Sequence, residues 1–143
     1  MTQTQTLEVD IQAALVANLI ATPKILPDVQ VAMPLVTFKP VDNTPYLDAR
    51  PVLRAQPQHP ALDFSGSNLN MGIFQVDAVI PDGQGEAPGL RLAEQVRARF
   101  ALGTVLAAGS YKLQIVKSVS IAAAVKDAPW IRFPVSIPYL VIS

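Results

Sequence analysis

The stretch WIRFPVSIPYLVI at residues 130–142 constrains the fold more than any other part of this sequence. Every second residue in it is apolar: Ile131, Phe133, Val135, Ile137, Tyr139 and Val141. This alternation is typical of a β-strand with one buried face, because successive side chains point to opposite faces of a sheet. So long a strand requires a sheet, and its apolar face requires a second layer to cover it.

The prolines of this stretch predict how the strand pairs. Pro134 and Pro138 are an even number of residues apart, so both remove N–H donors from the same side of the strand. One side can pair regularly with a neighbour, while the other cannot support a continuous ladder. The pattern therefore predicts an edge strand whose open edge is protected against pairing.

Two helices are predicted to supply the covering layer. In the first, Thr6 can cap the N-terminus, Glu8 and Asp10 place negative charge in the first turn, and Pro23 sets the latest end. Its apolar stripe consists of Leu7, Ile11, Leu15 and Leu19. The second runs from about Pro88 to Phe100, before Gly103 as a natural stop. Its inward residues are Leu92, Ala93, Val96 and Phe100, and Arg91, Glu94 and Arg97 lie outside at ion-pair spacing.

The remaining strands are predicted at residues 28–40, 45–55, 71–80 and 111–121. In 45–55, the residues Leu47, Ala49 and Leu53 share one face, and Tyr46, Asp48, Arg50 and Arg54 share the other. In 71–80, the residues Phe74, Val76, Ala78 and Ile80 lie opposite Gln75 and Asp77. The expected fold class is α+β, with a mainly antiparallel or mixed sheet of about four to five strands. Both helices pack on this sheet, and the order is α-β-β-β-α-β-β.

Size and composition fit one domain, residues 1–143, with a long loop at about 55–70. Half of the residues are hydrophobic and the formal net charge is zero, which argues against a broad basic surface for nucleic acid. Zero net charge also leaves little repulsion between copies of the chain. Cysteine is absent, which excludes disulfides and thiolate metal sites. The start, MTQTQTLEVD, does not resemble a signal peptide, and no transmembrane helix is expected.

The stretch VIPDGQGEAPGLRLAEQVRARF raises the possibility of a phosphate-binding loop. A dinucleotide fingerprint needs G-x-G-x-x-G, whereas Gly83, Gly85 and Gly89 place the third glycine one residue too far. Pro88 lacks an N–H donor, and Glu86 puts a carboxylate where phosphate oxygens would lie. The stretch predicts instead a turn that ends a strand, followed by a helix with Pro88 in its first turn.

Candidate catalytic groups are few. His59 is the single histidine, and Asp63 and Ser65 follow it in the same loop, which leaves a small hydrolase as a remote alternative. One loop supplies neither the rigid support nor the oxyanion hole that a catalytic triad needs. The acidic residues are scattered and lack calcium-loop spacing: Asp42, Asp48, Asp63, Asp77 and Asp82. The prediction is a protein that is not an enzyme and has no catalytic, cofactor-binding or metal-binding residues.

Several sequence segments, in their order along the chain, resemble the tail terminator (tail completion) proteins of long-tailed bacteriophages. They are FKPVDNTPYLDARP, then GIFQVDAVIPDGQG followed by LAEQVRARF, and finally WIRFPVSIPYL. The resemblance implies a structural role in virion assembly, as a homo-oligomeric ring, usually a hexamer. Such a ring caps the head-proximal end of the tail tube, stops tube polymerisation and provides the surface for head-tail joining.

The resemblance also implies the partners and the location. The partners are further copies of the chain, the tail tube protein and head-tail connector proteins, with DNA passing through the lumen as cargo and no membrane. The location is the virion tail, assembled in the host bacterial cytoplasm. Another neck or tail-tube component, such as a connector, stopper or tube protein, is the alternative.

The loop at about 55–70 contains two apolar residues, Leu62 and Phe64, among polar neighbours. Apolar side chains of this size in a polar loop generally contact either a partner surface or the core of their own domain. We expect Leu62, Phe64, Asn68 and Asn70 to contact a neighbouring subunit or the tail tube, and Phe64 packed on its own domain is the alternative.

Overall fold

The computed structural model describes residues 7–21, 24–27, 30–50, 53–54, 69–109 and 111–142. Its two helices are α1 (Leu7–Leu19) and α2 (Ala87–Arg99). The strands before α2 are β1 (Val31–Ala32), β2 (Tyr46–Ala49), β3 (Leu53–Arg54) and β4 (Leu69–Pro81). Those after it are β5 (Val105–Ala108), β6 (Tyr111–Gln114), β7 (Ser120–Ile121), β8 (Val125–Asp127) and β9 (Trp130–Ile142).

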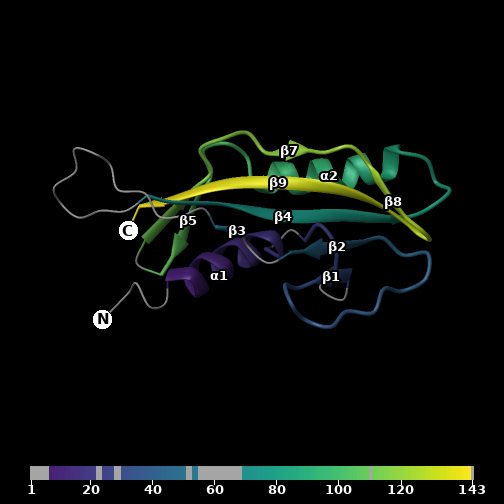
Figure 1. Ribbon diagram of the computed structural model, residues 1–143, viewed down its shortest axis with the longest axis horizontal. Helices are drawn as coiled ribbons and strands as arrows, with labels where there is room; N and C mark the ends of the chain where they lie inside the picture. The colour runs from purple at the N-terminus through teal and green to yellow at the C-terminus, as the bar shows by residue number, and fades with distance from the viewer. Residues whose placement is uncertain are drawn as a thin grey trace.

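Two long antiparallel strands, β4 and β9, form the spine of the molecule (Figure 1). They pair along their full length, from Leu69 opposite Ile142 to Pro81 opposite Trp130. Within the described residues the sheet has nine strands, in the order β1-β2-β4-β9-β6-β5, while β3 pairs with β4, and β7 and β8 pair with β9. The β1–β2 pair is parallel and the other pairs are antiparallel.

The predicted fold class, α+β with a mixed sheet and two packed helices, is confirmed. The predicted number of four to five strands is wrong, because the described residues alone contain nine. The four additional strands are short: β3 and β7 have 2 residues each, β8 has 3 and β5 has 4. Such short segments carry little periodicity, so the sequence does not mark them. The predicted strand at 45–55 is replaced by β2 and β3, and the one at 111–121 by β6 and β7. The predicted strand at 28–40 is reduced to Val31–Ala32, and turns follow it.

The prediction that residues 130–142 form an edge strand is also wrong, since β9 lies between β4 and three short strands. On that second side, β8 pairs with residues 130–132, β7 with 135–136 and β6 with 140–141. Pro134 and Pro138 fall in the gaps between these partners. The prolines do interrupt the ladder on one side, as their spacing predicts. Three separate short strands nevertheless pair with β9 on that side: β8 before Pro134, β7 between the two prolines and β6 after Pro138.

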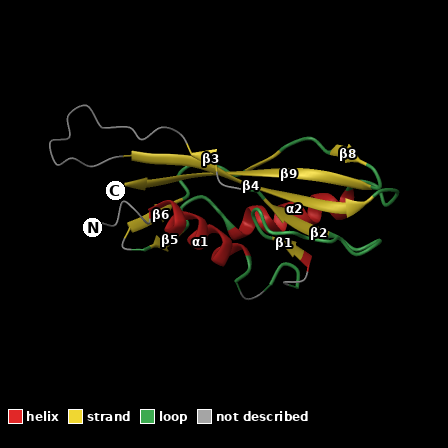
Figure 2. Ribbon diagram, turned by 60° about the horizontal axis from the view of Figure 1, so that its bottom comes forward, coloured by secondary structure: helices red, strands yellow, loops and turns green. Residues whose placement is uncertain are grey.

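Both helices pack on one apolar face of the sheet (Figure 2). The core joins Ile11, Leu15 and Leu19 of α1 with Leu92, Ala93 and Val96 of α2. From the sheet it includes Phe74, Val76, Ala78 and Ile80 of β4 and Phe133, Val135, Ile137, Tyr139 and Val141 of β9. These are the faces that the sequence predicted, although the side chain of Leu7 lies outside the described part.

The ends of the two helices are also joined by polar contacts. Asn18 Nδ2 donates to the carbonyl of Arg99 at 2.9 Å, and Arg99 Nη1 donates to the carbonyls of Asn18 and Ala21 at 3.0 and 2.7 Å. The helix α2 ends at Arg99, before the predicted stop, and Gly103 (φ +91°) lies in the turn to β5. These bonds satisfy carbonyl groups that a helix C-terminus leaves without a partner.

The glycine-rich stretch forms a turn and a helix start, as predicted. Gly83 and Gly85 have positive φ angles of 95° and 79°, which glycine adopts without steric cost. Gly89 has a different role, because it is buried in α2 and a Cβ atom there would overlap the ring of Phe133. This glycine lets the helix approach β9 closely.

Candidate functional site

A charged network lies on the opposite face of the sheet, away from the helices. At its centre is Asp77 of β4, which is only 1% exposed. Its Oδ2 accepts hydrogen bonds from Arg50 Nε and Nη2 at 3.0 and 2.7 Å and from Arg132 Nη1 at 3.2 Å. Its Oδ1 accepts one from Gln75 Nε2 at 3.0 Å. The buried carboxylate is thus fully engaged, as a buried charge must be.

Arg132 of β9 connects this carboxylate to two further acids. Its Nη1 donates to Asp48 Oδ2 at 2.7 Å, its Nε donates to Asp127 Oδ2 at 2.9 Å, and its Nη2 donates to Tyr46 Oη at 3.3 Å. The three acids come from β2, β4 and β8, so one guanidinium on β9 joins four strands.

The network also affects proton affinities. Burial lowers the pKa of Arg132, but the hydrogen bonds to Asp48 and Asp127 outweigh burial and raise the pKa above its ordinary value. Burial raises the pKa of Tyr46, against the lowering effect of Arg132. Arg132 stays charged and Tyr46 stays neutral at physiological pH.

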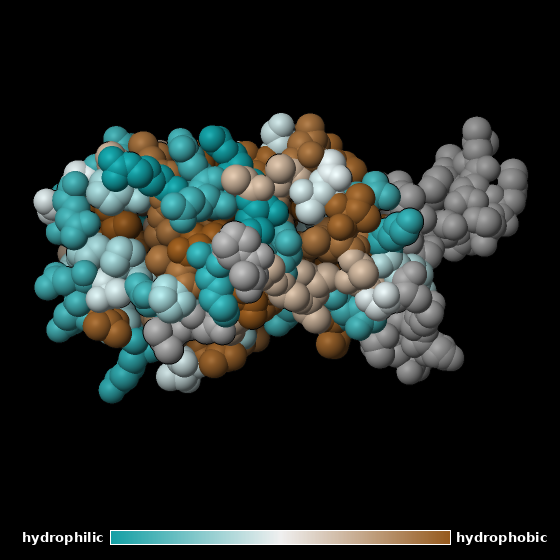
Figure 3. Space-filling model, turned by 180° about the vertical axis from the view of Figure 1, so that it is seen from behind, coloured by the Kyte–Doolittle hydropathy of each residue, from teal (hydrophilic) through white to brown (hydrophobic). Residues whose placement is uncertain are grey.

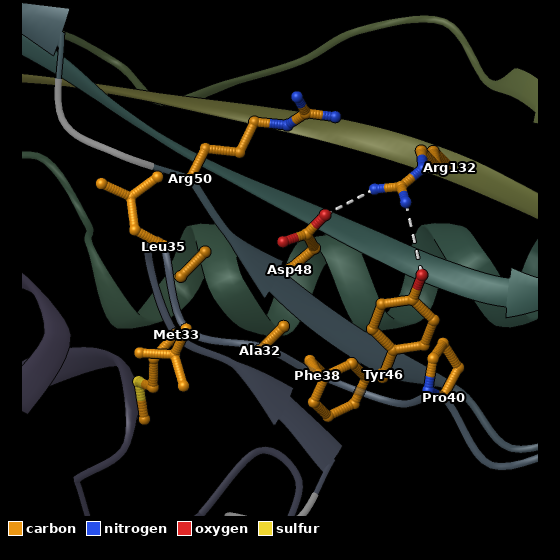
Figure 4. A pocket seen from close by; sticks show the side chains of 11 residues that line it. Ala32, Met33, Leu35, Phe38, Pro40, Tyr46, Asp48, Arg50 and Arg132 are labelled. Carbon is orange, nitrogen blue, oxygen red and sulfur yellow. Dashed lines mark hydrogen bonds and ion pairs between the residues drawn. The ribbon is translucent and has the colours of Figure 1, made fainter.

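A hollow of about 440 Å³ opens in front of this network (Figure 4). Figure 4 shows Arg132 reaching from β9 toward Asp48 and Tyr46 on one side of the hollow. The lining residues of the other side are apolar: Ala32, Met33, Leu35, Val36, Phe38 and Pro40. Phe38 and Tyr46 are in ring contact at 5.0 Å, and Trp130 meets Tyr46 edge-on at 5.3 Å.

The contacts of this site join neighbouring strands through ion pairs. Arg132 holds Asp48 and Asp127 in ion pairs, and Asp77 is bound by two arginines. A guanidinium cannot give up its proton in a protein, so it does not act as a general acid. Within the described residues there is no group of three or more potential metal ligands and no helix long and apolar enough to cross a membrane.

The predicted partner-contact residues lie largely outside the described part of the chain. This applies to Leu62, Phe64 and Asn68, and also to His59. Asn70 belongs to β4, where its backbone is opposite Val141, and its side chain is not described.

The sequence reasoning missed the network, because it treated the acidic residues as scattered. The register places Asp48 directly opposite Asp77, and Arg132 lies on the same sheet face. A signal was present: Asp48, Asp77 and Arg132 all occupy outward positions of their strands. Charges of opposite sign on one predicted face indicate a cross-strand cluster, but only the strand order brings them together.

This chain is similar to one protein family and to solved structures. The phage tail terminator protein family matches residues 10–139. One solved structure is 24% identical, with a TM-score of 0.67 over 99% of this chain and 96% of that chain. A chain from the virion of a native gene transfer agent particle is 19% identical, with a TM-score of 0.67 over 96% of this chain and 98% of its own. No curated protein sequence matches this chain significantly.

The likeness to the two solved structures concerns the fold, which extends over nearly the whole chain in both. The family match includes β4, α2 and β9 except the final residues of β9, which are the elements that build the core and carry the charged network. The chain therefore belongs to the phage tail terminator family and is a structural protein of the phage tail.

Proposed function

We propose that the protein forms a homohexameric ring that caps the head-proximal end of the tail tube. The ring stops the addition of tube subunits and provides the surface to which the head connector binds. DNA passes through its lumen without being read. The family match over residues 10–139 is the observation that carries this proposal.

The fold likeness to a chain of a gene transfer agent virion supports a place in such a particle. The molecule's own properties agree with assembly into a ring. Its β4–β9 spine is paired along its whole length, which gives a rigid frame for contacts between subunits. Its formal net charge of zero leaves little net repulsion between identical copies. Apolar and polar side chains mix on the surface seen in Figure 3, without one continuous apolar face.

Electron microscopy of particles assembled without this protein tests the function. We expect tails of irregular, excessive length that fail to join heads, because nothing ends tube growth. Supplying the wild-type protein restores tails of uniform length that join heads. Normal, joined tails in its absence would refute the terminator function.

Another neck or tail-tube component is the alternative, and purified proteins separate the two. A terminator added to growing tubes of the tail tube protein shortens them at substoichiometric amounts, because it acts at ends. A tube protein would copolymerise along the length, and a connector or stopper would bind the head side and leave tube length unchanged.

A catalytic role is tested separately by His59→Ala. We propose that the protein is not an enzyme, so this variant keeps full activity in tail assembly. Loss of a hydrolytic activity, with assembly intact, would favour the hydrolase instead.

We further propose that the chain is one tail-terminator domain and that its loop at about 55–70 contacts a neighbouring subunit or the tube through Leu62, Phe64, Asn68 and Asn70. Replacing Leu62 and Phe64 together by Ser reduces assembly and leaves the stability of the monomer unchanged. Unchanged assembly with a less stable monomer would mean that these side chains pack on their own domain.

A further inference from the structure

The turn after β1 holds an apolar side chain in an unfavourable position. Val36 N donates to the carbonyl of Met33 at 3.2 Å. This bond closes a four-residue turn in which Pro34 is the second residue and Leu35 is the third. Leu35 has a φ of +58° and is 92% exposed. A positive φ at the third position of such a turn is typical of glycine or asparagine.

Leu35 thus carries two costs in the isolated chain. Its Cβ is crowded by the backbone in the left-handed region, and its side chain lies in water. The other described non-glycine residue with positive φ is Asn43, whose side chain tolerates this conformation. A strained residue that also exposes a large apolar group suits a contact surface better than a simple turn.

Further apolar side chains lie near Leu35. Beside the turn, a hollow of about 350 Å³ separates it from the outer side of α1. No ionisable side chain lines this hollow: its residues are Val9, Gln12, Ala13, Val16, Met33, Pro34 and Val36. Val9 and Val36 are themselves 69% and 61% exposed. On the side that faces α1, this surface therefore suits an apolar occupant.

We infer that this surface, which we name the Leu35 knob (Val9, Leu35 and Val36), binds a second copy of this chain. The inference rests on the proposed ring, because a ring needs contacts between two different surfaces of the same subunit. The Leu35 knob is one of them, and the receiving surface must lie elsewhere on the chain and be equally apolar.

The β5–β6 hairpin and the turn before it provide that receiving surface. Val105 pairs with Gln114, and Val116 is two residues further along the chain. Val105 and Val116 therefore lie on the same side of this hairpin, opposite the buried Leu113 and Ile115. Leu102 lies at the adjoining turn, where Gly103 N donates to the carbonyl of Ile115. Leu102, Val105 and Val116 are 61%, 55% and 41% exposed. The other exposed large apolar residues of the described part, Val41, Ile73 and Val125, lie on separate elements.

The variant Leu35→Asn tests the contact with opposite effects on two measurements. Asparagine accepts a positive φ, so the thermal unfolding midpoint of the monomer stays the same or rises by a few degrees. Self-association, measured by sedimentation equilibrium, weakens at least tenfold. The control Val125→Asn removes another exposed apolar side chain, on β8 (51% exposed), and leaves self-association unchanged.

Disulfide trapping identifies the receiving surface, because the chain has no cysteine of its own. A mixture of Leu35→Cys and Val105→Cys proteins forms a cross-linked dimer under mild oxidation. Each variant alone does not, since a head-to-tail contact brings different residues together. A mixture of Leu35→Cys with Val125→Cys stays uncross-linked.

The outcomes separate this inference from the proposed ring. If the wild type associates and Leu35→Asn associates equally well, the inference is overturned and the ring stands. If Leu35→Asn rings form normally but no longer stop tube growth, the Leu35 knob binds the tube protein and the inference fails. A wild type that stays monomeric both in solution and on tube ends would overturn the ring and the inference together.

Discussion

The two faces of the β4–β9 pair are built on different principles. The face covered by α1 and α2 consists of apolar side chains that are almost fully buried, such as Phe133 and Val135. On the opposite face, Asp77 is equally buried but is held by Arg50, Arg132 and Gln75. One strand pair therefore carries a non-directional core on one side and a directional charge network on the other.

The two faces contribute differently to the fold. Apolar packing depends on volume and tolerates several partners, so it distinguishes poorly between registers that differ by two residues, in which the same face stays buried. The network needs Asp48 opposite Asp77 and Arg132 within reach of both. A shift of one residue would turn both sets of side chains to the wrong faces, whereas a shift of two would keep the apolar face buried but move Asp77 away from Asp48 and Arg132. We therefore infer that the charged face selects the register that the apolar face stabilises.

Truncating the apolar face should have the largest effect. Phe133→Ala removes a ring that is 1% exposed and lies against Gly89, and we expect a loss of about 4 kcal/mol of unfolding free energy. Urea denaturation followed by circular dichroism measures it. A loss below about 1 kcal/mol would show that the core collapses around the missing ring and is less specific than described here.

Breaking the charged face comes next. Asp77→Ala removes a buried carboxylate that accepts four hydrogen bonds, three of them from arginine, which should cost about 3 kcal/mol. Asp127→Ala is the control, because that carboxylate is 56% exposed and its pair with Arg132 is worth about 1 kcal/mol or less. Equal losses in the two variants would mean that burial of Asp77 has no special importance.

The contact between the helix layer and the sheet can be tested at Gly89. Alanine favours helices, but its Cβ would overlap the ring of Phe133, so Gly89→Ala should destabilise by about 2 kcal/mol. In a Phe133→Ala background the same change becomes neutral or stabilising. Additive effects in the double variant would show that the ring is not the obstacle.

The smallest effect is expected at the rim of the network. Tyr46→Phe removes the acceptor of a 3.3 Å bond from Arg132, at a cost of about 1 kcal/mol at neutral pH. Because burial raises the pKa of Tyr46 in the folded state, its contribution is complete below pH 10 and declines as pH rises above 10. The variant should therefore lose less stability than the wild type between neutral and strongly alkaline pH. An identical alkaline decline would place the titration elsewhere.

Local sequence patterns predict the elements that have long, regular periods. The alternation in residues 130–142 and 71–80 predicts two strands and their buried faces, and the stripes of both helices predict what covers them. The turn at Gly83 and Gly85 and the start of α2 also follow from local chemistry. These features depend on residues close in the chain, where the backbone period fixes which side chains share a face.

Which strands are neighbours depends on the folded arrangement of the whole chain. Pro134 and Pro138 predict an interrupted ladder on one side of β9, yet β6, β7 and β8 fill the intervals and make β9 an interior strand. The same pairing converts scattered acids into the network of Asp48, Asp77 and Asp127 around Arg132. Strand order and register arise from contacts between distant residues, and no local period in the sequence records them.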